Sequence, residues 1–188
     1  VYYLKSLKVI EDNYGDSHPE YSNGLNNLVM LYKFMGRLEE SERLIKRLIE
    51  LTVESFGNKH PVYALTLNNL GSIYMAIGKD DEALAMFEEG LRTYNNLYGS
   101  KYNLGSSISI RGIADILVKR EQHEAAEKKY LESIEILTHV FDENHWHNAL
   151  SLKSLGNFYY NIGRYDQAIK YHNKALQVTV DLYGEKSD

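Results

Sequence analysis

The sequence predicts an all-α solenoid of about nine helices, built from antiparallel helix pairs that recur every 42 residues or so. Three observations favour this fold class: a repeat period across the chain, apolar residues at helical spacing within each repeat, and only two prolines among 188 residues. One helix pair cannot bury its own apolar face, so we expect neighbouring pairs to stack without a single central core.

An aromatic residue followed by glycine marks each repeat. The marker occurs four times, as Tyr14-Gly15, Phe56-Gly57, Tyr98-Gly99 and Tyr183-Gly184, and a degenerate copy is Phe141-Asp142. The successive spacings are 42, 42, 43 and 42 residues. This register divides the chain into the second helix of a preceding repeat (1–13), repeats 1 to 4 (14–55, 56–97, 98–140 and 141–182) and the start of a further connector (183–188). Because Val1 is not methionine and a repeat is interrupted at each end, we expect the native protein to carry more sequence on both sides.

Each repeat contains two helical patterns separated by a tight turn. In repeat 2, residues of one helix face recur at i, i+3, i+4 and i+7: Leu67, Leu70, Gly71 and Tyr74. Gly78 stands where this helix must end, and Pro61 stands near its start, where a missing N–H costs nothing. Gly36 and Gly163 occupy the position of Gly78, but repeat 3 has Glu121 there.

Composition and motifs exclude several classes of protein. The chain has no cysteine, which argues against zinc fingers, iron–sulfur proteins and disulfide scaffolds, and its net charge of −5 argues against general nucleic-acid binding. No apolar run suits membrane insertion, and no signal peptide opens the chain. His145 and His147 would diverge on a helix, and His172 takes the place of a large core residue. No phosphate loop or nucleophile motif occurs, so we expect no catalysis, no metal and no cofactor.

The repeat resembles a known family. Its small, large and glycine positions resemble the tetratricopeptide repeat, whose units stack into a right-handed superhelix. The period of 42 residues, the Leu-Asn-Asn-Leu runs at 25–28 and 67–70, and the Gly-x-x-His-Pro connectors at 15–19 and 57–61 resemble the kinesin light chain type. The resemblance covers nearly the whole chain and is strongest in repeats 1 and 2.

In the proteins that this chain resembles, the first helix of each repeat lines a concave, peptide-binding groove. The matching positions lie between the predicted core positions: Asn26, Met30 and Lys33 in repeat 1, Asn68, Ser72 and Met75 in repeat 2, Arg111, Asp115 and Lys119 in repeat 3, and Lys153, Asn157 and Tyr160 in repeat 4. Strict register places Val118 one residue before Lys119.

Four of these residues are cations and one is an anion, although the whole chain is acidic. The contrast predicts that the groove binds an extended acidic peptide, and the resemblance implies an aromatic anchor in that peptide. Two alternatives stay open. The cations are equally well read as ordinary solvated charges, and the asparagines can bridge neighbouring helices, a role that we favour for Asn27 and Asn69 over Asn26 and Asn68.

The sequence therefore predicts a non-catalytic protein–protein interaction module in a larger cytoplasmic adaptor, such as a kinesin light chain-like motor-cargo protein associated with microtubules. Two alternatives are a structural scaffold in a large cytoskeletal or ciliary assembly and the regulatory region of a signalling enzyme. The sequence that flanks this chain would distinguish them.

Overall fold

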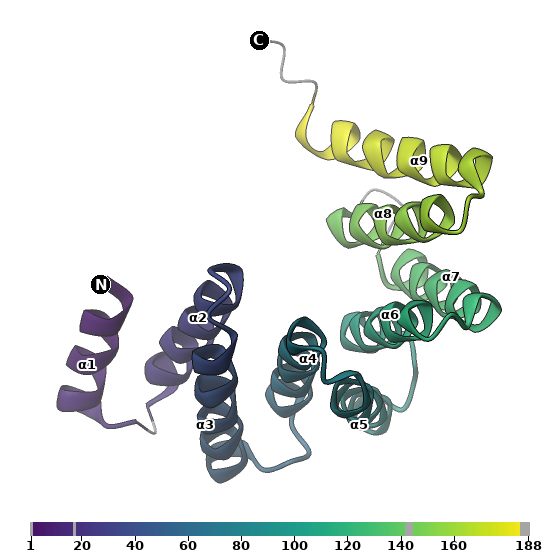
Figure 1. Cartoon of the computed structure of the whole chain (residues 1–188). Helices are drawn as coiled ribbons and strands as arrows, with labels where there is room; N and C mark the ends of the chain where they lie inside the picture. Colours follow the sequence, from purple (N-terminus) through teal and green to yellow (C-terminus); the bar gives the residue numbers. More distant parts are fainter. Residues whose placement is uncertain (1, 17, 142–144, 185–188) are drawn as a thin grey trace. The chain divides into compact units, whose positions relative to one another are not determined.

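The computed structural model describes residues 2–16, 18–141 and 145–184. In these ranges the secondary structure consists of nine α-helices and no strand, as the sequence predicts (Figure 1). The helices are α1 (Tyr2–Tyr14), α2 (Pro19–Phe34), α3 (Leu38–Phe56), α4 (Pro61–Ile77), α5 (Asp80–Tyr98), α6 (Leu104–Lys119), α7 (His123–Val140), α8 (Trp146–Asn161) and α9 (Tyr165–Tyr183). Asp142 of the degenerate marker and residues 185–188 of the predicted connector lie outside the described residues.

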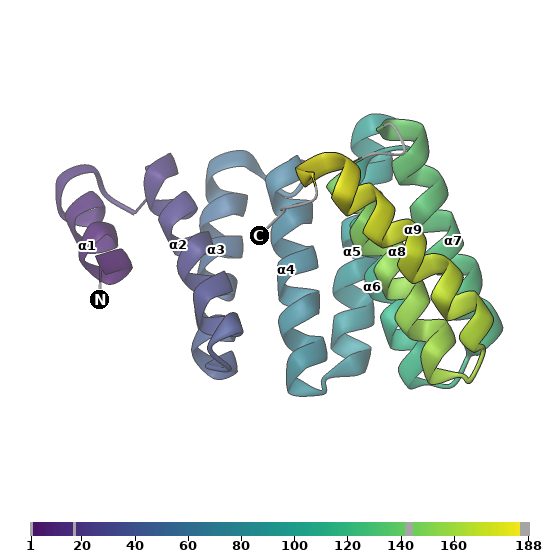
Figure 2. The same cartoon turned by 90° about the horizontal axis from the view of Figure 1, so that it is seen from above.

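The chain divides into two compact units, and each is described by itself. Unit 1 is residues 1–93 and unit 2 is residues 94–188. In unit 1, helices α2, α3 and α4 lie side by side, and Figure 2 shows the same succession from above. In unit 2, α6 pairs with α7 and α8 pairs with α9.

Each unit has an apolar core between its helices. In unit 1, Val29, Ile45 and Ile73 have no exposed surface, and they bring α2, α3 and α4 together. In unit 2, Leu155 and Phe158 of α8 pack with Tyr130 of α7. Each fully buried aliphatic or aromatic side chain contributes roughly 1.5–3 kcal/mol, so stability is distributed along the chain, as expected of stacked repeats.

The turn inside each helix pair uses a left-handed residue. Gly78 ends α4 with φ of 87°, and its equivalents Gly36 and Gly163 have φ of 74° and 77°. These angles confirm the predicted role of glycine at this position. Glu121 adopts the same conformation with φ of 59°, the one non-glycine residue with positive φ in the described chain. A side chain there costs about 1–2 kcal/mol relative to glycine.

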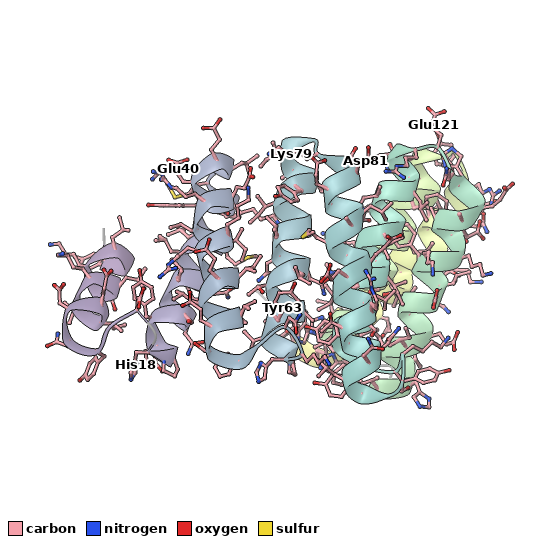
Figure 3. The ribbon with its side chains drawn as sticks, turned by 90° about the horizontal axis from the view of Figure 1, so that it is seen from below. His18, Glu40, Tyr63, Lys79, Asp81 and Glu121 are labelled. Atoms are coloured by element: carbon pink, nitrogen blue, oxygen red, sulfur yellow. The ribbon has the colours of Figure 1, made fainter. Side chains whose placement is uncertain are left out.

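The connector histidines cap the helices that follow them. The Nδ1 atoms of His18, His60 and His145 accept hydrogen bonds from backbone N–H groups in the first turns of α2, α4 and α8. Figure 3 shows His18 at the start of α2. Each ring also lies against the marker aromatic four residues earlier; the His60 and Phe56 centroids are 4.6 Å apart. In repeat 3, the Asn103 side chain accepts from Ser106 N–H at 2.8 Å, so asparagine replaces histidine as the cap.

Small residues let the two helices of a pair approach closely. A Cβ atom on Gly71 of α4 would lie 3.1 Å from the Phe87 ring of α5, and one on Gly156 of α8 would lie 2.9 Å from the His172 ring of α9. His172 therefore packs in the place of a large core residue, as predicted from the repeat register. In the pair α6 and α7, the small residues are Ala114 and Ala126, and both are fully buried.

Candidate peptide-binding face

The candidate residues of unit 1 lie on α2 and α4, where polar side chains join the two first helices. Lys33 Nζ on α2 donates to Ser72 Oγ on α4 at 2.7 Å, and Ser72 Oγ donates to the Asn69 carbonyl at 2.9 Å. Asn69 Nδ2 also donates to Asn26 Oδ1 at 3.1 Å. The bridging role predicted for Asn69 is confirmed. Burial lowers the pKa of Lys33, whose ammonium is partly removed from water.

Two other candidates of unit 1 differ in exposure. Met30 is 40% exposed, while Met75 is half-buried. Asn68 is only 3% exposed, and a Cβ atom added to Gly90 of α5 would lie only 2.8 Å from its side-chain oxygen. The expectation that Asn68 points away from the core is therefore wrong. Helix α4 is covered by α5 on that side, and Gly90 leaves room for the amide, which helical periodicity alone does not indicate.

Two candidate residues of repeat 3, Arg111 and Asp115, form a half-buried charged group on α6. The Tyr130 hydroxyl of α7 donates a short hydrogen bond to Asp115 Oδ1. Arg111 lies one turn before Asp115 and interacts with both groups through charge. No hydrogen bond joins the Arg111 guanidinium to another of the described residues. This cation can therefore accept a carboxylate ligand without first breaking an internal hydrogen bond.

Burial dominates the electrostatics of this charged group. It raises the pKa of the Asp115 carboxyl, while the Tyr130 hydroxyl and the charges of Arg111 and Lys119 act in the opposite direction. Burial also lowers the pKa of Arg111 and raises that of Tyr130. On α8, burial together with His145 and Arg111 lowers the pKa of His147 to about 4, so this imidazole is neutral near pH 7.

The candidates of repeat 4 and Lys119 are open to solvent. Lys119, Lys153 and Asn157 are exposed, and Tyr160 is 63% exposed with its ring edge against Tyr165 at 5.7 Å between centroids. The candidate residues of unit 2 thus include desolvated charges on α6, accessible charges on α6 and α8, and an accessible aromatic ring on α8. Among these candidates, the structure links Lys33 with Ser72 across α2 and α4, and Arg111 with Asp115 on α6.

Sequence reasoning missed two groups beside the candidates. The hydrogen bond from the Tyr130 hydroxyl to Asp115 does not follow from the repeat pattern. The pattern places a large core residue at position 130 but does not indicate which group its hydroxyl contacts. The sequence pattern raises His147 only as a possible metal ligand, yet its side chain is buried, and its pKa is lowered by burial, by His145 and by the charge of Arg111. The one sequence signal for the proximity of His147 to Arg111 is the spacing of 42 residues, which aligns α8 with α6.

Neither a metal site nor a membrane-spanning helix occurs among the described residues. Among the described residues, no group of three His, Cys, Asp or Glu side chains is arranged to hold a metal ion. Within the same residues, no helix is both long and apolar enough to span a membrane.

Comparison with known proteins identifies the repeat. The family model of the tetratricopeptide repeat matches residues 21–96 and 105–179. No curated protein matches the chain significantly.

Solved structures with the same fold include three with little sequence identity. BtubC (BKLC) from P. vanneervenii superposes with a TM-score of 0.73 at 16% identity, over 99% of this chain and 74% of that chain. Nearly identical TPR-like repeats from Podosopora anserina, described as those of a putative kinesin light chain, give 0.64 at 15% identity, over 98% and 86% of the two chains. A single-substitution variant of those repeats gives 0.67 at 16% identity, over 96% and 84%. These likenesses confirm the predicted all-α solenoid.

Proposed function

Because this chain belongs to the tetratricopeptide repeat family, a family of protein–protein interaction modules, we propose that its first-helix faces bind an extended acidic peptide. The first-helix face of unit 1 is the exposed side of α2 and α4, and that of unit 2 is the exposed side of α6 and α8. The observation that carries the proposal is the half-buried Arg111 guanidinium, which has no hydrogen-bond acceptor among the described residues.

Arg111 gives the site its preference for acidic partners. A desolvated guanidinium forms stronger hydrogen bonds to a carboxylate than a solvated one does, and its planar fork suits bidentate contact. The exposed Lys153 of α8 would add long-range attraction and orient the incoming peptide. Tyr160 offers an accessible ring for an aromatic or apolar anchor.

The proposal extends to the cellular role. Since repeats described as those of a kinesin light chain share this fold, we propose that the chain works as a kinesin light chain-like adaptor that links a cargo peptide to a larger protein. The binding site is tested by comparing the affinities of acidic and neutral peptides. The cellular role is tested by identifying the peptides that the protein captures from a mixture.

The site is tested by titrating a fluorescent peptide that has one tryptophan flanked by Asp and Glu, and a matched peptide with Asn and Gln in their place. We expect the acidic peptide to bind more tightly, with an affinity that falls as salt is added. Lys153→Glu should weaken binding about 5-fold and Arg111→Gln about 10-fold, which correspond to roughly 1 and 1.4 kcal/mol.

Lys128→Glu is the matched control, because Lys128 is also exposed but lies on the second helix α7. It changes net charge equally and should leave the affinity nearly unchanged. Equal binding of the two peptides, or an equal loss in Lys153→Glu and Lys128→Glu, would contradict a specific site for acidic peptides on this face.

A further inference from the structure

Asp115 of α6 is a charged residue at a position that is neutral in the other repeats. The equivalent residues are Met30, Ser72 and Asn157. In unit 1 the side chain at this position meets the first helix beside it, because Ser72 accepts the hydrogen bond of Lys33. Stacking of the repeats does not require a carboxylate here, and half-burying one carries a cost in desolvation. Its presence therefore indicates a role other than holding the helices together.

The Tyr130 hydroxyl of α7 accompanies this acid and donates a hydrogen bond to Asp115 Oδ1. The residues equivalent to Tyr130 are Ile45, Phe87 and His172, which have no hydroxyl, so the pair of tyrosine and aspartate belongs to repeat 3 alone. A carboxylate offers about four acceptor positions, and Tyr130 uses one of them. No other hydrogen bond to Asp115 is found in the described chain, so its second oxygen is open to a proton or to a ligand.

Asp115 lies one helical turn after Arg111, the cation to which the proposed peptide binds. Residues four apart on a helix have Cβ atoms about 5–6 Å apart. The two charges act on each other, yet no direct ion pair joins them within the described ranges. A carboxylate that binds Arg111 would therefore come close to a second carboxylate. Two such charges at short range cannot both stay ionised without a large cost.

On the premise that an acidic peptide binds Arg111, we propose that Asp115 is a specificity-determining residue of that site, which takes up a proton from the solvent when a peptide carboxylate binds. The neutral carboxyl group still accepts the Tyr130 hydrogen bond through one oxygen and can donate its own O–H to the bound carboxylate through the other. The ionised group instead repels the peptide. The site therefore binds acidic peptides most tightly at mildly acidic pH.

The groups around Asp115 act on it in both directions. Burial raises the pKa of its carboxyl, while the Tyr130 hydroxyl of α7 and the charges of Arg111 and Lys119 on α6 lower it. On α8, His147 interacts with Arg111 through charge. A bound carboxylate adds a like charge and offsets the attraction of Arg111, so it raises the pKa of Asp115 further. The complex then holds more protons than the free protein, and affinity increases as the pH falls through the pKa in the complex.

Calorimetric titration of the acidic peptide into the protein at pH 7.5 and pH 5.5 tests this coupling. At both pH values the Asp and Glu side chains of the peptide stay largely ionised, and His147, whose pKa is about 4, stays neutral. We expect the wild-type affinity to rise about 5-fold between pH 7.5 and pH 5.5. Heats measured in two buffers with different ionisation enthalpies should show that the complex takes up part of a proton per peptide.

Asp115→Asn gives the decisive comparison, because asparagine still accepts the Tyr130 hydrogen bond but carries no charge and does not titrate. At pH 7.5 this variant should bind the peptide about 5-fold more tightly than the wild type, and the gain should shrink at pH 5.5. Glu124→Gln is the matched control, since Glu124 is an exposed acid of α7 and its loss changes the net charge equally. It should bind like the wild type at both pH values.

Weaker binding by Asp115→Asn than by the wild type at pH 7.5, or an equal gain in Glu124→Gln, would overturn the role of Asp115. So would wild-type binding without proton uptake, a measurement that does not depend on the folding of any variant. These results would leave the proposed peptide site standing. If neither the wild type nor Asp115→Asn bound the acidic peptide at either pH, the peptide site itself would be rejected, and the role of Asp115 with it.

Discussion

The first-helix faces of the two units share one repeat register but hold their charged groups differently. In unit 1, the Lys33 ammonium donates a hydrogen bond to the neutral Ser72 hydroxyl. In unit 2, Arg111 has no hydrogen bond to another described residue, and the nearby Asp115 accepts a hydrogen bond from the Tyr130 hydroxyl. The comparison shows that the repeat register sets the position of a residue on its helix. Side chains of neighbouring helices then determine whether its polar group is hydrogen-bonded within the fold or remains available to a ligand.

The largest expected change in the free energy of unfolding comes from removing the Tyr130 hydroxyl, which donates a hydrogen bond to Asp115. Tyr130→Phe leaves a half-buried carboxylate without its donor and should lower the free energy of unfolding by about 2 kcal/mol. Lys33→Met should change it by less than about 0.5 kcal/mol, because Ser72 keeps its bond to the Asn69 carbonyl. Urea unfolding followed by circular dichroism measures both.

Tyr159→Phe provides the control for that experiment. The Tyr159 hydroxyl donates to Glu127, but Arg164 also contacts the same carboxylate, so its loss leaves a partner. We expect a smaller destabilisation than in Tyr130→Phe. Similar losses in Tyr130→Phe and Lys33→Met would remove the contrast between the two faces.

The turns of the two units offer a second comparison. Gly78→Ala in unit 1 places a Cβ atom at φ of 87° and should destabilise the chain by about 1–2 kcal/mol. Glu121→Gly in unit 2 relieves the same conformation and should stabilise it by about 1 kcal/mol. Thermal unfolding of both variants tests this pair, and a destabilised Glu121→Gly would show that the Glu121 side chain outweighs its backbone cost.

The buried imidazole of unit 2 predicts a pH dependence. The pKa of His147 is lowered to about 4 in the fold, below its usual value near 6.5. Between these values the unfolded chain binds a proton that the folded chain does not, so stability falls as the pH drops from 6.5 toward 4. Removing this titration should reduce the loss between pH 7 and pH 5 by on the order of 1 kcal/mol.

His147→Gln tests that expectation by comparing its unfolding free energy with the wild type at both pH values. The difference between the two proteins isolates His147 from the other groups that titrate in this range. An identical pH dependence in both would mean that His147 takes up its proton equally in the folded and unfolded chains.

The helix caps should give the smallest effect. His60→Ala removes the acceptor for Val62 N–H and should cost about 0.5 kcal/mol, while His60→Asn should retain much of it, since asparagine is a strong N-cap residue. Asn103→Ala should cost a similar amount in repeat 3. Hydrogen exchange of the first turns of α4 and α6 measures the local change, and unchanged protection in His60→Ala would assign its role to ring packing on Phe56 alone.

Much of the fold could be predicted from the sequence because repeated residues impose repeated geometry. Gly78 and Pro61 indicated the ends of α4, and the places of Gly71 and Ala126 indicated close helix packing. The candidate site was less predictable. Asn68 has the helical phase of a groove residue, yet Gly90 of the neighbouring helix makes room for its amide in the interior.

The sequence by itself determined the period, the helix pairs, the glycine turns and the family, since each follows from spacing along one chain. Only the tertiary structure decided which hydroxyl donates to Asp115, that Lys33 donates to Ser72, and that the Asn68 amide is buried. The physical reason is that burial and hydrogen bonding depend on side chains of other helices, whose distance and shape a local pattern does not contain.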